Sequence, residues 1–397
     1  MATHYIILFI VAITATWWIY RKVHRIAVLK GITDNPDGRK LQKKPVPVLG
    51  GAAVFFGMVV ALLVAGVEFE ASKTFTVVCA FTIMLYVGTM DDILSLSPYL
   101  RLAVEILVIS LLIYGGCGCV DDFHGLWGIH GVPDWIAVPL TVFACVGIIN
   151  AINLLDGVNG LSSGYCIMAC IAFGGAAIWS GDVKSATFAV ISIGSLIPFF
   201  SHNVFGKKSK MFIGDGGTLL MGTIMAYFVI NALKGDSPLL SVAGENFGNV
   251  AFTLAILAIP VFDTIRVMGS RILSGISPFR PDKTHLHHLL ISLGFSHVGT
   301  TLTEISLSVV IFGSWLASWR LGASIDAQLY VVLTMGFLST FGAYWYGSTQ
   351  ERHKGRTYRF LAGIGEKTHV GHKKWFEGIT KFLDRNYKDE ETDGESR

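Results

Sequence analysis

The chain has 397 residues, of which 52% are hydrophobic and 15% are charged, with 31 Lys and Arg against 28 Asp and Glu. Soluble globular proteins carry about 25% charged residues, so this composition excludes an ordinary soluble protein and indicates a membrane protein with several crossings. The net charge of +3 is small for a chain of this length, and we expect no nucleic-acid partner.

Apolar segments long enough to cross a bilayer, for which about 20 residues are needed, recur along most of the chain. They lie near residues 4–20, 48–67, 74–90, 99–116, 134–154, 160–179, 184–201, 217–233, 248–265, 303–319 and 327–347. The sequence therefore predicts an all-α polytopic membrane protein with about eleven transmembrane helices in one domain, residues 1–350. A polar tail, residues 351–397, follows this domain.

Positive charges indicate the orientation, because short loops rich in Lys and Arg stay in the cytoplasm. An odd number of crossings places the two termini on opposite sides. Under this alternation 27 of the 31 Lys and Arg fall on the side of the C-terminus, and four fall on the other side: Lys73, Lys184, Lys234 and Arg320. The sequence therefore predicts an N-terminus outside the cell and a C-terminus in the cytoplasm.

Two adjacent carboxylates, Asp91 and Asp92, end the apolar segment 74–90. An Asp at the centre of a membrane helix costs about 2.5–3.5 kcal/mol on insertion scales, but far less at a helix end that faces water or a cation. The pair is either a turn in the headgroup region or part of a metal or phosphate site. A second pair, Asp121 and Asp122, falls on the other side without polar companions, and we interpret it as a solvated loop.

A polar stretch from Asn150 to Gly160 follows another apolar segment on the predicted cytoplasmic side. It contains Asn153, Asp156 and Asn159. Amide side chains can bond the edges of a base or a sugar. A helix C-cap and turn is the alternative, but such a turn needs one Gly or Asn, whereas this stretch holds several.

A glycine-rich stretch, Phe212 to Thr218, places Asp215 among three glycines just before an apolar segment. Backbone N–H groups at a helix N-terminus favour anions, and a carboxylate can hold Mg²⁺. This combination suits a pyrophosphate with its cation. The alternative is an Asp that caps the helix, followed by flexible glycines.

Three histidines, His285, His287 and His288, lie within four residues and follow Arg280 and Lys283. Histidines flanked by Arg and Lys indicate a cationic loop that grips phosphate. A zinc site and a solvated basic loop are the alternatives.

Taken together, these motifs resemble those of the polyprenyl-phosphate N-acetylhexosamine-1-phosphate transferases, glycosyltransferase family 4. The resemblance covers residues 1–350 in matching order and rests on Lys44…Gly50-Gly51, Asp91-Asp92, Asn150-Ala-Ile-Asn-Leu-Leu-Asp-Gly, Phe212-Ile-Gly-Asp-Gly-Gly and Pro281-Asp-Lys-Thr-His-Leu-His-His. The interrupted histidine motif is similar to the UDP-GlcNAc:undecaprenyl-phosphate GlcNAc-1-phosphate transferase branch. The phospho-MurNAc-pentapeptide translocases instead carry three consecutive histidines.

The resemblance implies transfer of GlcNAc-1-phosphate, or a related N-acetylhexosamine-1-phosphate, from a UDP-sugar to undecaprenyl phosphate, with release of UMP. It implies Mg²⁺ as cofactor, with Mn²⁺ as an alternative, and a multi-pass protein of the bacterial plasma membrane with its active site on the cytoplasmic face. We expect the lipid bilayer as a partner, with a homodimer as a further option. The alternatives are the same reaction with UDP-MurNAc-pentapeptide, an ion-coupled transporter and a membrane prenyltransferase.

The resemblance also implies roles for individual residues. Asp215 would bind Mg²⁺, Asp91 would meet the lipid phosphate as base or nucleophile, and Asp92 would support Asp91 or the metal. The histidines would grip the donor phosphates or sugar. The remaining contacts to the nucleotide and pyrophosphate would come from Lys44, Asn153, Asp156, Asn159, Asn203, Phe212, Arg280 and Lys283. The chain departs from the family pattern at Asn159, where the family usually has Asp.

The tail contains one amphipathic stretch near residues 373–387. Its large apolar residues follow an i, i+1, i+4, i+7, i+8 pattern and are flanked by basic residues: Trp375, Phe376, Ile379, Phe382 and Leu383. This pattern predicts a helix that lies on the anionic cytoplasmic leaflet. Docking onto the membrane domain or onto a partner is the alternative.

Overall fold

The computed structural model describes residues 2–36, 44–66, 71–278 and 282–387. Within these ranges, ten helices are long and apolar enough to cross a membrane. They are α1 (Ala2–Leu29), α3 (Ala71–Leu94), α4 (Pro98–Leu112) with a π-helical turn at Ile113–Cys117, α5 (Asp134–Leu154), α6 (Leu161–Ser180), α7 (Val183–Phe205), α8 (Gly214–Leu233), α10 (Asn249–Leu273), α12 (His297–Arg320), and α13 (Ile325–Phe337) continued through a π-helical turn at Leu338–Gly342 into α14 (Ala343–His353). The prediction of an all-α polytopic membrane protein is confirmed.

One predicted segment, 48–67, forms a shorter helix than expected. Helix α2 spans Gly50–Val64, about 22 Å at 1.5 Å per residue. It packs tightly against its neighbours, because a side chain at Gly57 would collide with Thr16 of α1, and one at Gly51 would collide with Gly217 of α8. The eleven predicted segments therefore appear, within the described part of the chain, as ten long helices and one short one.

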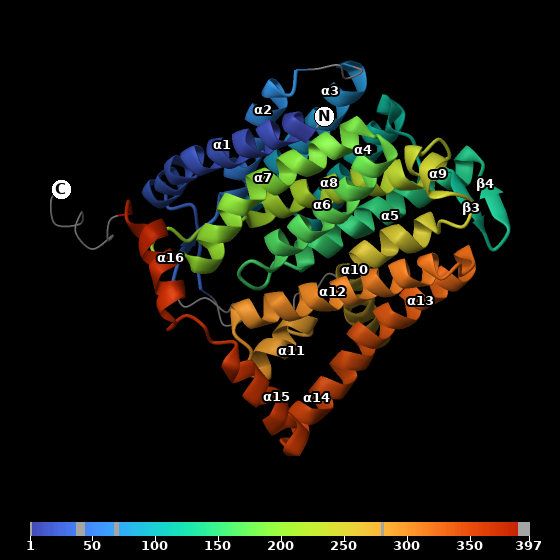
Figure 1. Ribbon diagram of the computed structural model, residues 1–397. Coiled ribbons are helices and arrows are strands. Elements are labelled where there is room, and N and C mark those ends of the chain that lie inside the picture. Colours follow the sequence, from blue (N-terminus) through green and yellow to red (C-terminus); the bar gives the residue numbers. More distant parts are fainter. Residues whose placement is uncertain (1, 37–43, 67–70, 279–281, 388–397) are drawn as a thin grey trace.

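Helix α8 forms the centre of the bundle. It contacts α2, α3, α5, α6 and α10, and nearly all of its side chains are buried. A helix that is apolar on every side is buried, either among other helices or in lipid. Figure 1 accordingly shows α8 enclosed within the bundle, near α5, α6 and α7. The core of the protein therefore surrounds the helix that begins with the Asp215 motif.

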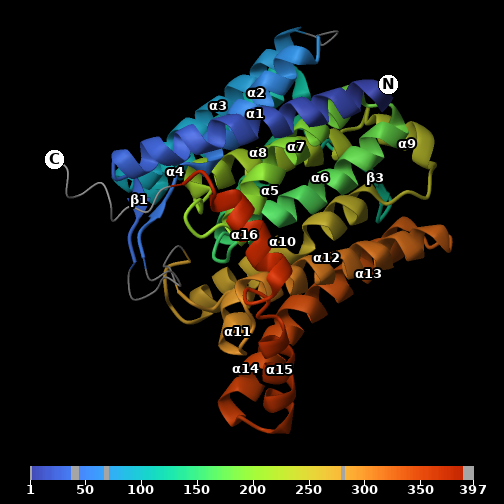
Figure 2. The same ribbon diagram turned by 60° about the vertical axis from the view of Figure 1, so that its left-hand side comes forward.

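A second group of helices flanks this bundle. Helices α10, α12 and α13 pack against one another, and α14 leads away from the bundle toward α15 (Arg356–Lys367), as Figure 2 shows. The short helix α11 (Leu286–Ser292) fills the angle between α12 and α14. Its buried residues form a small separate apolar cluster: Leu286, Leu289 and Leu293, with Tyr344, Tyr358 and Leu361 around them.

Two small antiparallel sheets complete the fold, with a short helix, α9 (Pro238–Ala243). Strand β1 (Thr33–Asp34) pairs with β2 (Val46–Pro47), and β3 (Asp122–Leu126) pairs with β4 (Ile129–Gly131). The second sheet differs from the free loop expected at Asp121 and Asp122. Asp121 Oδ1 accepts a hydrogen bond of 2.7 Å from the Gly235 N–H, which ties this hairpin to the end of α8.

The amphipathic stretch of the tail forms α16 (Lys374–Asp384), which docks against α7. Phe376 and Leu383 are buried at this contact, whereas Trp375 and Phe382 are exposed. The exposed rings leave an apolar edge that can reach the bilayer surface. Docking, which was the alternative expectation for this segment, is therefore the arrangement in the structure.

The predicted orientation can be tested at two exposed positions on opposite ends of the bundle, Lys207 after α7 and Ile129 in the hairpin. In a Cys79→Ala background, a membrane-impermeant maleimide should label Ile129→Cys in intact cells and Lys207→Cys after the cells are opened. Cys79 is the native cysteine to replace, because the other five are buried. Labelling of Lys207→Cys from outside intact cells would contradict the orientation.

Candidate active site

Four helices bring polar side chains to one end of the bundle. Asp91 lies in the last turns of α3, and Arg101 lies in the first turns of α4. Asn153 lies near the end of α5, and Asp215 is the second residue of α8. Motifs that are distant in sequence therefore meet at one membrane face, as the sequence analysis expected.

The centre of this site is a pair of carboxylates that share one cation. The carboxyl groups of Asp91 and Asp215 lie close enough to interact directly. Arg101 Nη1 lies 3.3 Å from Asp91 Oδ2 and 4.0 Å from Asp215 Oδ2. The guanidinium group therefore offsets the repulsion between two carboxylates that would otherwise disfavour their joint ionisation.

Asn153 orients the Asp215 carboxylate. Its Nδ2 donates to Asp215 Oδ1 and to Thr218 Oγ1, both at 2.8 Å. The Asp215 side chain is 37% exposed. Part of this carboxylate is therefore accessible to a ligand.

Asp92 caps helix α8 from the neighbouring helix α3. Its Oδ1 accepts from the Asp215 N–H at 2.9 Å, and its Oδ2 accepts from the Gly216 N–H at 3.3 Å. A negative charge at a helix N-terminus also interacts favourably with the helix dipole. In this structure Asp92 thus holds the loop that carries Asp215, while its role toward a metal stays a prediction.

A buried carboxylate supports Arg101 from behind. Glu105, one turn along α4, has 1% of its side chain exposed and lies 3.5 Å from the Arg101 Nε. Glu105 Oε2 also accepts a hydrogen bond of 2.5 Å from Asn150 Nδ2. Arg101 and Glu105 were not among the residues predicted for the site. Their signal was an Arg–Glu pair at i, i+4 spacing in an otherwise apolar segment.

The loop before α8 is built by pairing with the segment that follows Lys44. The Phe212 N–H donates to the Pro47 carbonyl at 2.8 Å, and the Gly50 N–H donates to the Phe212 carbonyl at 2.9 Å. The Phe212 ring is half-buried, and the Lys210 Nζ lies 5.7 Å from its centre. Lys44 is exposed at the start of this segment. The backbone of Phe212, a predicted nucleotide contact, is therefore held by hydrogen bonds from both of its peptide groups.

Asn203 joins the two loops at the edge of the site. Its Oδ1 accepts from the Gly160 N–H at 2.7 Å, and its Nδ2 donates to the Met211 carbonyl at 2.9 Å. The residue is buried, so it acts on the site through the loops that it connects. Contact between Asn203 and a nucleotide stays a prediction.

Asp156 and Asn159, two predicted contact residues of the stretch 150–160, have different surroundings. Asp156 is exposed, and its Oδ1 accepts a hydrogen bond of 2.5 Å from Ser162 Oγ. The Asn159 backbone is fixed by two bonds, from its N–H to His297 Nδ1 at 3.2 Å and from Thr301 Oγ1 to its carbonyl at 3.0 Å. These contacts anchor the backbone around Asn159 to α12.

His285 is held by a buried aspartate on α10. Its Nδ1 lies 2.8 Å from Asp263 Oδ2, and the other oxygen of Asp263 accepts from Arg266 at 2.7 Å. Arg266 also donates to the Thr284 carbonyl at 2.6 Å. Asp263 therefore links the histidine loop to α10, and neither it nor Arg266 was among the predicted site residues.

His287 and His288 follow in the same loop. The His285 and His287 rings are parallel with centres 5.5 Å apart, and those of His287 and His288 are 4.4 Å apart. Burial lowers the pKa of His287 well below its usual range and also lowers the pKa of His288. Both imidazoles are therefore neutral at pH 7. The predicted phosphate grip would use ring N–H groups at these positions, with positive charge supplied by their neighbours.

Two basic residues complete the expected set in this loop. Lys283 is exposed, while Arg280 lies outside the described residues. The neighbouring Asp282 is bonded to Arg271 Nε at 2.8 Å and to the Thr284 N–H at 2.9 Å. Although burial alone would raise the pKa of Asp282, these bonds lower it. The base of the loop is therefore fixed by an ion pair.

A divalent cation can be fitted to this arrangement only as a partly hydrated ion. Zinc sites use three or four protein ligands, and among the described residues no group of three His, Cys, Asp or Glu lies at metal-binding spacing. Mg²⁺ is usually held by one or two carboxylates, with water and substrate phosphates in the other positions. The carboxylate of Asp215, which Asn153 orients, fits that donor set.

The fold and the site define a multi-pass membrane protein whose carboxylate and histidine groups converge at one membrane face. The sequence model of Glycosyl transferase family 4 matches residues 74–233. A probable undecaprenyl-phosphate N-acetylglucosaminyl 1-phosphate transferase of Bacillus subtilis (strain 168) is 32% identical over 294 residues, which cover 74% of this chain and 78% of the relative. Undecaprenyl-phosphate alpha-N-acetylglucosaminyl 1-phosphate transferases of Yersinia pestis and Escherichia coli (strain K12) are 30% and 27% identical, over 75% and 81% of this chain and 78% and 85% of the relatives. The chain belongs to glycosyl transferase family 4.

A substitution at Gly157 can test whether the stretch 150–160 and the histidine loop must stay in contact. A side chain at Gly157 would collide with the His287 ring, so Gly157→Ala should displace the histidine loop. A displacement of about 1 Å can lower turnover by up to about 100-fold, which steady-state kinetics would measure. Gly147→Ala on α5 is the matched control, because a side chain there meets open space. Equal activity of the two variants would contradict this packing role.

Proposed function

We propose that the protein transfers GlcNAc-1-phosphate, or a related N-acetylhexosamine-1-phosphate, from a UDP-sugar to undecaprenyl phosphate and releases UMP. Membership of the family and the printed activities of the relatives support this reaction. The structural observation that carries the proposal is the carboxylate pair Asp91 and Asp215 at a membrane face, bridged by Arg101. A site at the end of a membrane helix can meet a lipid phosphate from the bilayer and a nucleotide from water.

The reaction joins an oxygen of the lipid phosphate to the sugar-bearing phosphorus of the donor. The bond from this phosphorus to the bridging oxygen breaks, and UMP leaves with that oxygen. We assign Asp91, in the last turns of α3, either to the lipid phosphate as its base or to the sugar-bearing phosphorus as a nucleophile that the lipid phosphate then displaces. Arg101 would hold the Asp91 carboxylate in place through its contact at 3.3 Å.

Asp215 would hold Mg²⁺, and Asn153 would keep the Asp215 carboxylate oriented. When bound, Mg²⁺ neutralises phosphate oxygens and stabilises the charge that develops during phosphoryl transfer. The N–H groups of Asp215 and Gly216 at the start of α8 already donate to the Asp92 side chain, so they are not free to bind a substrate phosphate. The bound pyrophosphate would therefore rely on the metal and the histidine loop.

The histidine loop would bind the donor from the opposite side of the site. Asp263 fixes the ring of His285, and the collision expected at Gly157 shows that His287 lies against the stretch 150–160. Neutral imidazoles suit hydrogen bonds to phosphate or sugar oxygens. Lys283 would add positive charge at the mouth of this loop.

We also propose that the site faces the cytoplasm, where nucleotide-linked sugars are made. The support is the distribution of Lys and Arg, most of which lie at the same end of the bundle as Asp91 and Asp215 under the predicted alternation. The relatives are bacterial, which supports the bacterial plasma membrane as the location.

Asp215→Asn should lower Mg²⁺-dependent UMP release by several orders of magnitude, because the change removes a carboxylate that we assign to the metal. Asp121→Asn is the matched control, because an amide oxygen can still accept the bond from the Gly235 N–H. Rates of UMP release from purified protein in detergent would measure both effects. Similar losses in the two variants would mean that aspartates of this chain act mainly through stability.

A donor panel tests the proposed substrate. With undecaprenyl phosphate and Mg²⁺, UDP-GlcNAc or a close UDP-N-acetylhexosamine should release UMP, whereas UDP-MurNAc-pentapeptide should not. A pocket that reads hydroxyl and amide groups can reject an analogue without them by about 10⁴-fold or more. Turnover of the pentapeptide donor without turnover of UDP-GlcNAc would overturn the donor assignment and leave the reaction type standing.

A further inference from the structure

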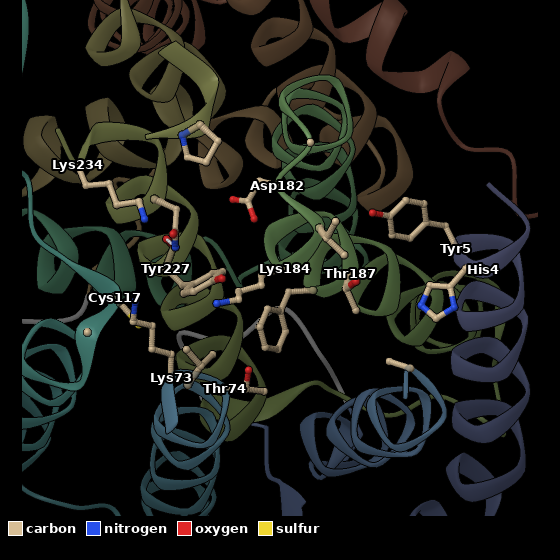
Figure 3. Close-up of a pocket in the computed structure, with 18 of the residues that line it drawn as sticks. His4, Tyr5, Lys73, Thr74, Cys117, Asp182, Lys184, Thr187, Tyr227 and Lys234 are labelled. Carbon is tan, nitrogen blue, oxygen red and sulfur yellow. Dashed lines mark hydrogen bonds between the residues drawn. The ribbon is translucent and has the colours of Figure 1, made fainter. Parts of the chain in front are cut away.

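The two ends of the helical bundle are packed differently. At the end away from the candidate active site, a cavity of about 730 Å³ lies among α1, α3, α7 and α8 (Figure 3). At the end that carries the site, the chain after α14 folds back onto α11, the short helix that contains His287 and His288. We call this returning part of the chain, residues 355–370, the α15 segment.

The chain reverses its direction directly after α14. Lys354 ends this helix in a left-handed conformation with a φ of 51°, as is common at helix C-termini, and Gly355 follows. Helix α15 then packs against α14, as Figure 1 and Figure 2 show. Because α11 also contacts α14, the reversal places the α15 segment beside the histidine loop.

Helix α11 has seven residues, too few to be stable without tertiary contacts. At its start, Asp263 Oδ2 lies 2.8 Å from His285 Nδ1. Its buried apolar face packs against two side chains of α15, Tyr358 and Leu361, and against Tyr344 of α14. The position of α11 therefore depends on its neighbours, and α15 is one of them.

A backbone contact joins α15 to the turn after α11. A side chain at Gly365 would come within 2.7 Å of the Gly294 carbonyl carbon and within 2.9 Å of the Phe295 nitrogen. Gly294 has a φ of 89°, which favours glycine. Two glycines that are distant in sequence thus allow the backbones of α15 and of this turn to meet directly.

Two hydrogen bonds lie beside the backbone contact. The Ser296 N–H donates to Thr368 Oγ1 at 2.9 Å, and the Ser296 hydroxyl donates to the Thr368 carbonyl at 2.7 Å. Ser296 is also the N-cap of α12, because its Oγ accepts from the Gly299 N–H at 3.1 Å. The α15 segment is therefore hydrogen-bonded to the turn that connects α11 with α12.

This turn affects the position of two predicted donor contacts. His287 and His288 lie in the first turn of α11, and the His287 ring lies against Gly157 of the stretch 150–160. His287 is 2% exposed, so its placement depends on packing around the whole ring. A helix of seven residues is about 10 Å long, and a shift at its C-terminal end would also move the histidines at its start.

We propose that the α15 segment is part of the donor site, with Gly365 and Thr368 as positioning residues that hold α11 and its histidines against the stretch 150–160. This inference rests on the proposed function, in which the histidine loop binds the UDP-sugar. It extends the site beyond residue 350, where the predicted transferase domain ends. A tilt of α11 should affect binding of the donor more than binding of the lipid acceptor.

Gly365→Ala and Gly363→Ala form a matched pair for the test. Both replace a glycine of α15 by alanine and change helix propensity alike, but a side chain at Gly363 meets open space. In purified full-length protein, Gly365→Ala should raise hydrogen–deuterium exchange of residues 286–293. It should also raise the KM for UDP-GlcNAc by about tenfold or more, because contacts to a charged phosphate are weakened. The kcat and the KM for undecaprenyl phosphate should change less, and Gly363→Ala should match the wild type.

A second pair of variants tests the hydrogen bonds. Thr368→Val removes the hydroxyl that accepts from Ser296 and should act as Gly365→Ala does, whereas Thr368→Ser keeps a hydroxyl and should restore wild-type values. If Gly365→Ala does not fold, as judged by its thermal melt, this pair decides.

Equal exchange of residues 286–293 in Gly365→Ala and Gly363→Ala would overturn the proposal, and so would raised exchange without a change in the donor KM. If the wild type releases no UMP from any UDP-sugar, the proposed function itself fails and this proposal fails with it. A wild type that is active, with unchanged donor KM in all folded variants, would overturn this proposal alone.

Discussion

The structure depends on how the N-terminus of α8 is satisfied. A helix that begins inside a bundle leaves backbone N–H groups without partners, and near a membrane they have little access to water. The carboxyl group of Asp92 on α3 accepts hydrogen bonds from the N–H groups of Asp215 and Gly216. The central helix α8 is therefore capped by a side chain from a neighbouring helix. This contact fixes α3 relative to α8 and, with it, the distance between Asp91 and Asp215. The geometry of the catalytic carboxylates that we propose therefore follows from a capping interaction.

The charges of the site form one connected network. Arg101 lies near the carboxyl groups of both Asp91 and Asp215. On its other side Arg101 contacts Glu105, which also accepts a hydrogen bond from Asn150. Buried charges are tolerated when each has a partner and further hydrogen bonds, and they become costly when one partner is removed. Loss of Glu105 would thus affect the Asp91 carboxylate through Arg101, without direct contact between the two acidic residues. A substrate phosphate would enter a network whose acidic and basic groups already have fixed positions.

Hydropathy and the clustering of polar motifs at helix ends were sufficient to predict the helices and the convergence of Asp91, Asn153 and Asp215. Contacts between helices were harder to predict, because periodicity identifies a polar residue but not the helix that it faces. The contact of Asp92 with the N-terminus of α8 and the contact of Arg101 with Asp91 were not predicted. The hairpin at 122–131 was also missed, since two very short strands leave no alternating pattern.

The last turn of α16 reaches back to the loop between α7 and α8. Asp384 accepts bonds from the backbone N–H groups of Lys207, Lys208 and Ser209 and from the Ser209 hydroxyl, at 2.6–3.1 Å. These bonds lower the pKa of Asp384 although burial alone would raise it. The same loop leads directly into Phe212 and Asp215. Helix α16 is thus hydrogen-bonded to the loop that leads into the candidate site, so the seating of this helix and the position of Asp215 are linked through that loop.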